Sequence, residues 1–435
     1  MLLILTSLIS NRLTYISNLM VTGMLGIDVR LTASREEFIS YSGPKIVYSP
    51  QPLGDGLYIQ ASDLLFQTTF IHHDVECTGF NGVPVLFGMT HPLSALPFDP
   101  FAAAFYMVSR FEEYHSHKKD NYGRYPATES IAWKGRFLGI PIVHLWTGML
   151  ENLLISHYPG LKVRRPEYRY VPTIDIDHAW CYHGRSFTRT LGGIGRSVMR
   201  LKLPEITARL KVLAGLAPDP YDNYDFIESA HESYANFPLY FVLFADYGMN
   251  DNNVTVTSRK FTRLLQDLDK HGSVGIHPSL SSGRHLVKFE DEYEGLSAAL
   301  NRDVSISRQH FLKLSMPKTY RTLMQFGIKD DYSMGYASHP GFRAGIAMPF
   351  SFFDIGRDEV SSLIIHPVSL MDVTMKDYLR LSTVESREKI ADMIKTIKSV
   401  NGEFVSLWHN ESLGDTGRWE GWRSVYAEMV KQAST

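Results

Sequence analysis

The feature that most constrains the fold is an alternation of short β-rich segments with helical patterns, which begins near residue 168. Repeated strand–helix units predict parallel strands joined by crossover helices. Seven such strands favour a barrel-like sheet, in which functional residues lie at the carboxyl ends of the strands. The predicted strands are Tyr170–Ile176, Leu239–Phe244, Gly272–Ile276, Val304–Ser307, Ile328–Tyr332, Ser362–Ile365 and Glu403–Trp408.

Between these segments, the apolar spacing of three and four residues predicts helices. A helix over 258–271 has a serine at its start and Gly272 just past its end. Further helices are predicted over 320–326 and 384–400, each followed closely by a glycine. The glycines at 192, 193 and 195 follow no predicted strand, so they do not indicate a dinucleotide-binding loop.

The first part of the chain has a different texture, with short apolar runs separated by turn residues. The apolar start predicts a buried strand followed by an amphipathic helix, and residues 96–114 read as one buried helix. Residues 161–167 are polar with a proline, which is typical of a linker. We therefore predict a smaller α/β domain over 1–165 and an α/β domain, a distorted barrel of seven β/α units, over 166–435.

Composition excludes several classes of protein. The net charge is −2 at pH 7, which disfavours a nucleic-acid partner. Only Cys77 and Cys181 are present, so a thiolate-based zinc site is excluded, and aspartate and histidine remain as ligands. The first cation, Arg12, follows the apolar start, unlike in a signal peptide, and the run is too short to span a bilayer. We therefore expect a cytoplasmic protein; the sequence contains no indication of its oligomeric state.

Polar residues suited to catalysis follow several predicted strands. Asp175 and Asp177 are two residues apart at the end of the first strand, so their side chains point to the same face. One could hold a metal ion while the other accepts a proton from water. The alternative for this pair is that both residues simply begin a loop or cap a helix.

The later strands end in further chemically useful side chains. His277 precedes a proline at the end of the third strand and could present a neutral imidazole to a metal. Arg308 and His310 follow the fourth strand, Asp331 lies at the fifth, and His409 follows the seventh. Because parallel strands end at the same rim of a barrel, we expect these acids, bases and the guanidinium to converge there.

The order of these residues resembles that of the NodB-homology polysaccharide deacetylases, over residues 168–410. The chain is most similar to a divergent bacterial branch of that superfamily, whose N-terminal domain is uncharacterised. The sequence motifs on which the resemblance rests are Gly275-Ile-His-Pro-Ser279, Arg308-Gln-His-Phe-Leu312, Gly341-Phe-Arg-Ala-Gly345 and Leu407-Trp-His-Asn410.

The resemblance implies a distorted barrel and a metal-dependent hydrolysis of N-acetyl groups on sugars. It implies that Asp175 is the general base, that Asp177 and His277 bind the metal, and that His409 is the general acid. By the same resemblance, Arg308 orients the base and Asp331 tunes the general acid. The metal implied is divalent, most simply zinc, which polarises a carbonyl and acidifies water.

One departure from the family pattern concerns the metal. The family has a second ligand histidine four residues after the first, where this chain has Ser281. A serine hydroxyl is a poor zinc ligand, and a catalytic zinc usually has three protein ligands. His310 or His178 is expected to supply the missing nitrogen; His339 and His366 are further candidates, although the prolines after them mark loop turns.

Three functions remain open at this point. The first is a metal-dependent carbohydrate N-deacetylase. The second, motivated by Ser281, is a carbohydrate-binding descendant of that fold without catalysis. The third is a metal-dependent amidohydrolase acting on an amide that is not a sugar, since a fold does not fix its substrate.

Overall fold

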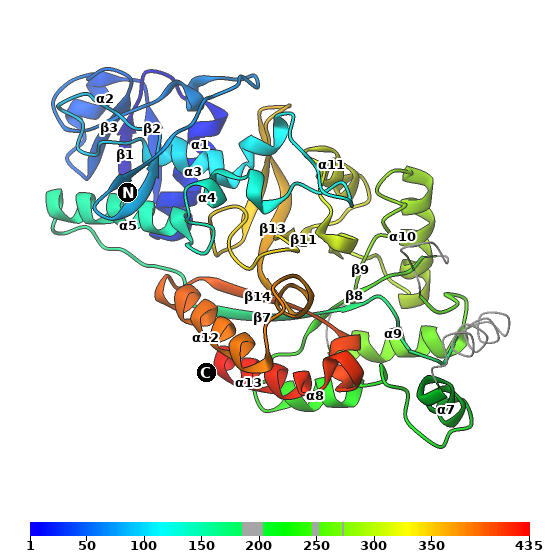
Figure 1. Cartoon of the computed structure of the whole chain (residues 1–435). Helices are drawn as coiled ribbons and strands as arrows, with labels where there is room; N and C mark the ends of the chain where they lie inside the picture. Colours follow the sequence, from blue (N-terminus) through cyan, green and yellow to red (C-terminus); the bar gives the residue numbers. More distant parts are fainter. Residues whose placement is uncertain (185–202, 246–250, 252, 272–273) are drawn as a thin grey trace.

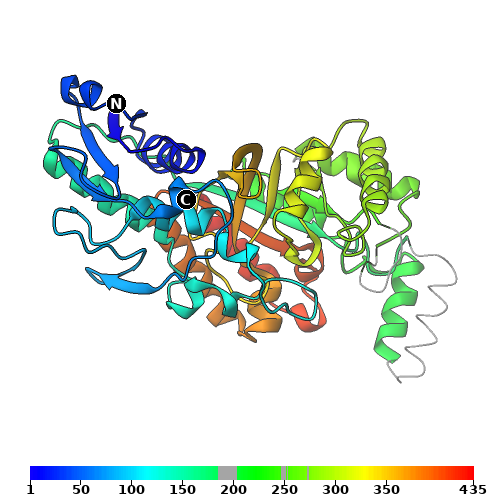
Figure 2. The same ribbon diagram turned by 90° about the horizontal axis from the view of Figure 1, so that it is seen from above.

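The chain forms two parts around one continuous hydrophobic cluster (Figures 1 and 2). The structure is a computed structural model and describes residues 1–184, 203–245, 251, 253–271 and 274–435. The glycines at 192, 193 and 195 and the predicted strand start at Gly272 lie outside the described residues. In Figure 2, the N-terminal sheet and its helices lie at one end of the molecule and the larger part extends away from them.

The N-terminal part contains a parallel sheet of four strands in the order β2-β1-β3-β4. A separate antiparallel hairpin joins β5 and β6. The strands are β1 Leu2–Leu5, β2 Val29–Thr32, β3 Lys45–Ser49, β4 Leu57–Gln60, β5 Cys77–Phe80 and β6 Val83–Leu86. The helices are α1 Asn11–Ser17, which continues as the π-helix η1 Asn18–Met24, and α2 Arg35–Ser40, α3 Pro100–Val108, α4 Ile131–Lys134 and α5 Ile142–His157.

Helix α3 is buried on every side, as expected for a helix that is apolar all round. The prediction of one helix over residues 96–114 was too long. The helix ends at Val108, and a short 3₁₀ turn, η3 (Phe111–Tyr114), follows. Arg110 between them has φ 53°, a left-handed conformation that interrupts the helix. This turn lets the guanidinium of Arg110 bond to the carboxylates of Glu112 and Glu113.

The larger part is a closed barrel of seven parallel strands, which confirms the barrel predicted from the sequence. Its strands are β7 Arg169–Ile176, β8 Leu239–Val242, β9 Val274–Ile276, β10 Ile306–Ser307, β11 Asp330–Met334, β13 Glu359–Met371 and β14 Glu403–His409. Strand β11 pairs with β13 and so closes the ring. An eighth strand, β12 (Phe350–Asp354), pairs antiparallel with β13 and was not predicted.

Helices flank the barrel strands (Figure 1). They are α7 Leu203–Leu213, α8 Tyr224–Glu232, α9 Arg259–His271, α10 Leu286–Leu300, α11 Lys318–Gln325, α12 Thr383–Ser399 and α13 Trp422–Ser434. Helix α12 begins with a capping box, in which the Ser382 hydroxyl accepts from the Glu385 amide and the Glu385 carboxylate accepts from the Ser382 amide. In the part of the chain that the structure describes, no helix has the length and apolarity to cross a bilayer.

The two faces of β7 explain how the fold positions a site. Tyr170 and Ile174 belong to the large outer cluster, whereas Val171 belongs to a smaller cluster formed mainly by the barrel strands. Thr173 and Asp175 follow Val171 at spacings of two, so they share its face. The interior face of β7 is therefore apolar near its start and polar near its carboxyl end.

The N-terminal part packs directly on the barrel through β12 and the loop after it. Tyr15 and Phe105 both contact Phe353, with ring centroids 5.2 and 5.1 Å away. The buried guanidinium of Arg12 lies 3.0 Å from the carboxylate of Asp358. These contacts hold the N-terminal part against the barrel wall.

Candidate metal centre and its surroundings

Three of the predicted residues converge at the carboxyl end of the barrel. Nε2 of His277 lies 3.3 Å from Asp177 Oδ1, and Nε2 of His310 lies 3.6 Å from Asp177 Oδ2. One ligand atom from each of these side chains can be chosen so that all lie within 4.8 Å of one another. Both imidazoles are buried, with side chains at most 8% exposed. One carboxylate and two imidazoles are a common ligand set for a catalytic zinc ion.

Hydrogen bonds on the far side of each imidazole aim the ligand nitrogens inward. Nδ1 of His277 lies 2.7 Å from the carbonyl oxygen of Arg308 and donates to it. Nδ1 of His310 lies 3.0 Å from Oδ1 of Asp251, which also accepts from the Leu280 amide. A donor role for Nδ1 leaves Nε2 as the acceptor, which is the tautomer that binds a metal.

Asp177 has a buried carboxylate oxygen that accepts no hydrogen bond from the described residues. This oxygen is Oδ1. A buried carboxylate oxygen without a partner is unfavourable. A divalent cation between this oxygen and the two Nε2 atoms would satisfy it, so the residues present fit a metal ion.

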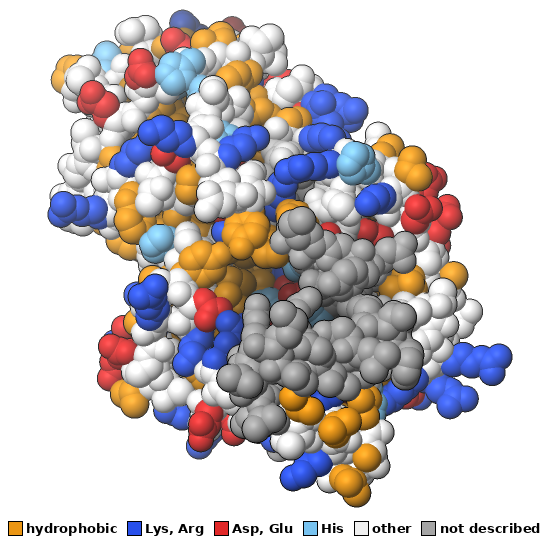
Figure 3. All heavy atoms as spheres, turned by 45° about the vertical axis from the view of Figure 1, so that its right-hand side comes forward, with side chains coloured by type: hydrophobic (Ala, Val, Ile, Leu, Met, Phe, Trp, Pro, Cys, Tyr) orange, Lys and Arg blue, Asp and Glu red, His pale blue; other side chains and the backbone are white. Residues whose placement is uncertain are grey.

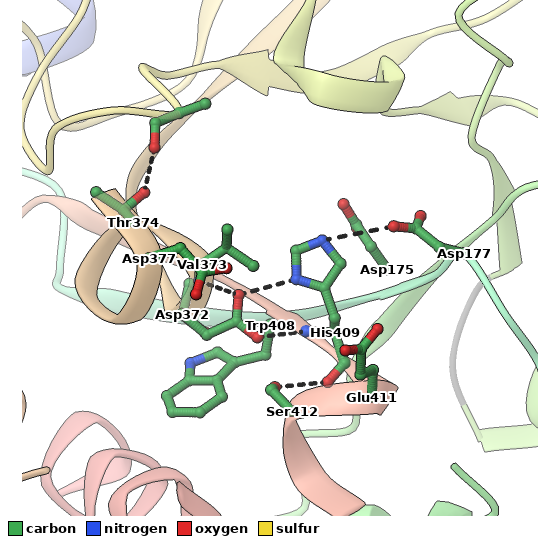
Figure 4. A network of polar contacts seen from close by, with 12 residues as sticks. Asp175, Asp177, Asp372, Val373, Thr374, Asp377, Trp408, His409, Glu411 and Ser412 are labelled. Atoms are coloured by element: carbon green, nitrogen blue, oxygen red, sulfur yellow. Dashed lines mark hydrogen bonds and ion pairs between the residues drawn. The ribbon is translucent and has the colours of Figure 1, made fainter. Parts of the chain in front are cut away.

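His409 lies beside this cluster, at the end of β14 (Figure 4). Its Nδ1 lies 2.8 Å from Oδ1 of Asp372, and its amide donates to Oδ2 of the same residue. Its Nε2 points toward Asp177, 3.9 Å from Oδ2. Burial by itself would lower the pKa of His409, but the carboxylates of Asp372 and Asp177 outweigh it and raise the pKa to about 10. The imidazole is therefore protonated at neutral pH.

Asp175 is fixed by Arg308 on the interior of the barrel. Nη1 of Arg308 donates to Oδ1 of Asp175 over 2.8 Å and to the Thr173 hydroxyl over 2.6 Å. The guanidinium is fully buried and lies over the Phe241 ring at 4.5 Å. The second oxygen of Asp175 lies 3.7 Å from Nε2 of His277. Asp175 thus borders the metal cluster without belonging to it.

The structure corrects the predicted partner of His409. Asp331 was expected to tune that histidine, but its carboxylate accepts from the hydroxyls of Ser307 and Ser333 and from the Ser333 amide. Asp372 makes the contact instead. The error came from the length of β13, which was predicted to end at Ile365 but continues to Met371. Asp372 is the residue directly after this longer strand, so strand-end reasoning would have found it with the right boundary.

His310, one of the histidines expected to supply a third ligand, lies in the cluster with Asp177 and His277. The Ser281 hydroxyl lies 3.0 Å from the Ser279 hydroxyl. His178, His339 and His366 do not join the cluster in the described part of the chain. His366 instead bonds to Glu403 and Asp330. Asp251, which holds His310, lies between predicted elements, and no signal in the sequence singled it out.

Comparisons of the sequence with known proteins find a family model for the N-terminal part and no match among the curated proteins. A family model described as a family of unknown function (DUF7033) matches residues 2–159, well under half of the chain. A search of the curated proteins finds no match to this chain.

Solved structures with low sequence identity align with about three fifths of the chain. One is described as "putative polysaccharide deacetylase from Mycobacterium smegmatis", with 15% identity, TM-score 0.40, and coverage of 62% of this chain and 85% of that chain. An allantoinase has 10% identity, TM-score 0.38, and coverage of 64% and 86%. A 4-alpha-glucanotransferase from Thermococcus litoralis has 13% identity, TM-score 0.36, and coverage of 62% and 38%.

Proposed function

We propose that this protein is a metal-dependent hydrolase that removes N-acetyl groups from acetamido sugars in a glycan. The observation that carries the proposal is the convergence of Asp177, His277 and His310 between two further acid–base groups. Those groups are Asp175 on one side and His409 on the other. A ligand set flanked by a base and an acid is the arrangement that amide hydrolysis requires.

A divalent ion held by Asp177, His277 and His310 would supply a Lewis acid that polarises the amide carbonyl and makes water more acidic. Asp175 is placed to accept the proton of the attacking water, because Arg308 holds one of its oxygens and leaves the other facing the cluster. The bond from Arg308 also fixes the orientation of the Asp175 carboxylate.

His409 is placed to donate a proton to the leaving amine. Its protonated form is maintained by Asp372, and its Nε2 faces the cluster. An amine leaves readily only after its nitrogen is protonated, so this histidine completes the reaction that Asp175 begins. The two roles follow from their partners, since a guanidinium favours a carboxylate base and a carboxylate favours an imidazolium acid.

The experiment is an acetate-release assay with and without a chelator, on tetra-N-acetylchitotetraose and on small non-sugar amides. We expect acetate from the sugar only when a divalent metal is present. We expect Asp175→Asn to lower kcat by about 10²–10⁴-fold, the contribution of a general base. Asp303→Asn, at an exposed position, serves as the matched control.

Three outcomes would contradict the proposal or part of it. A protein that binds no divalent metal would exclude this mechanism. Hydrolysis of the small amides but not of the sugar would replace the substrate class. Metal-independent sugar binding without acetate release would indicate the carbohydrate-binding alternative.

A further inference from the structure

A loop of the N-terminal part reaches the segment that carries His310. Nη1 of Arg124 donates to the carbonyl oxygen of Phe311 over 3.1 Å, and Nη2 donates to the Tyr378 hydroxyl over 3.1 Å. The ring of Tyr122 stacks on Phe311 with centroids 4.7 Å apart. Phe311 in turn packs against the His310 ring at 4.2 Å. The loop over residues 118–124 therefore lies next to the candidate metal centre.

The segment it contacts has an unusual backbone. Phe311 and Leu312 are consecutive non-glycine residues with φ 60° and 51°. Left-handed conformations at two such residues in a row are unfavourable and need support from their surroundings. The bond from Arg124 to the Phe311 carbonyl supplies part of that support. This turn places Lys313, the next residue, on the side that faces the loop.

Three cations gather at this junction. Atoms of Lys313 lie 3.5–3.6 Å from the position that a side chain at Gly123 would occupy, so this lysine lies against the loop. Burial lowers the pKa of Lys313, and the nearby charges of Arg284 and Lys119 lower it further. Within the described residues, no carboxylate forms an ion pair with Lys119, Arg284 or Lys313. Asp120 is close by, but Arg124 holds it at 2.6 Å.

Arg284 also lines a cavity of about 290 Å³ between α10 and α11. Gln309, the residue between Arg308 and His310, lines the same cavity, and so does Lys318. No acidic residue is among those that line it. Figure 3 shows Lys and Arg side chains at several places on one face of the molecule, its upper half included. Cations beside the candidate metal centre that form no ion pair with a described carboxylate attract and orient an anionic ligand.

We propose that Arg284, Lys313 and Lys119 form a subsite for an anionic group, a carboxylate or a phosphate, on the acetylated sugar substrate. The N-terminal part would thereby contribute directly to substrate selection. This inference rests on the proposed function, because it concerns the substrate of the same site. The subsite binds the charge of a group near the acetamide that is hydrolysed, and it takes no part in the chemical step.

The test measures binding, so that it does not depend on turnover. Calorimetry with the Asp175→Asn protein would use three probes that differ in charge. They are tetra-N-acetylchitotetraose, which is neutral, a tetrasaccharide of alternating glucuronate and N-acetylglucosamine, and uridine diphosphate N-acetylglucosamine. We expect at least one anionic probe to bind about tenfold more tightly than the neutral one, with a preference that falls at high salt.

Variants in the same background assign the preference to the cluster. Arg284→Gln and Lys313→Gln should each weaken binding of the anionic probe about tenfold and leave the neutral probe unchanged. Lys431→Gln, at an exposed position on α13, is the matched control and should change neither. Circular dichroism of each variant checks that the fold is kept.

The outcomes separate this inference from the proposed function. Preference for the glucuronate probe alone identifies a carboxylate ligand, and preference for the nucleotide sugar alone identifies a phosphate ligand. Equal binding of all three probes, or a preference that survives both variants, overturns the inference. Acetate release from a neutral sugar without any charge preference would overturn the subsite and leave the proposed function standing.

Discussion

Two buried ionic clusters in this protein have similar side chains and opposite character. One joins the N-terminal part to the barrel, where Glu113 accepts from Arg110 and bidentately from Arg343. The other is the candidate metal centre at the carboxyl end of the barrel. Most of the side chains in both clusters are buried, so most of their charges need a partner.

The interface cluster finds its partners within the chain. Both oxygens of Glu113 accept from guanidinium groups, and Arg110 also bonds to Glu112. Two arginines face two glutamates, which balances the charge. Burial would raise the pKa of Glu113, but the two guanidiniums outweigh it and lower the pKa to about 2. The charges of this cluster balance within the chain, although Nη1 of Arg110 has no hydrogen-bond partner among the described residues, and the cluster holds two parts of the fold together.

The metal centre has a surplus of negative charge. Its positive groups include the Arg308 guanidinium and the protonated His409 imidazole. The carboxylates around it outnumber these two and are those of Asp175, Asp177, Asp251 and Asp372. An oxygen of Asp177 accepts no hydrogen bond among the described residues. The difference teaches that the two clusters are told apart by their balance of charge, and not by the kinds of residue they contain.

The largest expected effect is a loss of metal affinity that leaves the interface cluster unchanged. Asp177→Asn removes a ligand and should weaken metal binding by more than the roughly 10–100-fold that losing an outer partner of a ligand causes. Added metal at 100 times its Kd should increase the free energy of unfolding of the wild-type protein by about 2.7 kcal/mol. The melting temperature should rise as a result. Thermal melts with and without metal would measure both, and a rise that persists in Asp177→Asn would refute the assigned ligand set.

A substitution in the interface cluster should lower the stability of the protein without changing its metal affinity. Glu113→Gln leaves two buried guanidiniums short of a charge partner and should lower the free energy of unfolding by about 3–5 kcal/mol. Metal affinity should stay unchanged, because Glu113 does not contact the metal centre. Urea denaturation and metal titration would test the two statements, with the exposed Glu290→Gln as control. A loss of metal affinity would show that the clusters are coupled.

The smallest expected effect concerns His409, the proposed general acid. Asp372 favours the charged form of His409, whose pKa is raised to about 10, so Asp372→Asn should lower that pKa. A general acid acts only below its pKa, so the alkaline limb of the pH–kcat profile should move to lower pH. Asp331→Asn should leave the limb in place, because the Asp331 carboxylate bonds to Ser307 and Ser333. A shift in the second variant instead would restore the role first predicted for Asp331.

The sequence by itself determined the barrel. All seven predicted strands are strands in the structure, because alternation with amphipathic helices is a local pattern that a short window reveals. It also placed Asp175 and Asp177 on one face, because side chains alternate along a strand. The aspartate and the two histidines of the metal cluster were named because each lies at or just after a strand end.

The partners of those residues were decided only by the tertiary structure. Asp372 replaced Asp331 beside His409 because β13 runs six residues beyond its predicted end, as Met371 against Ile365. Asp251 and Arg124 support the turn of His310 from distant parts of the chain. Such contacts depend on where loops of different elements meet, and no local periodicity encodes that. Seven strands could therefore be read from the sequence, while the end of β13 and the choice of His310 among the candidate ligands required the folded chain.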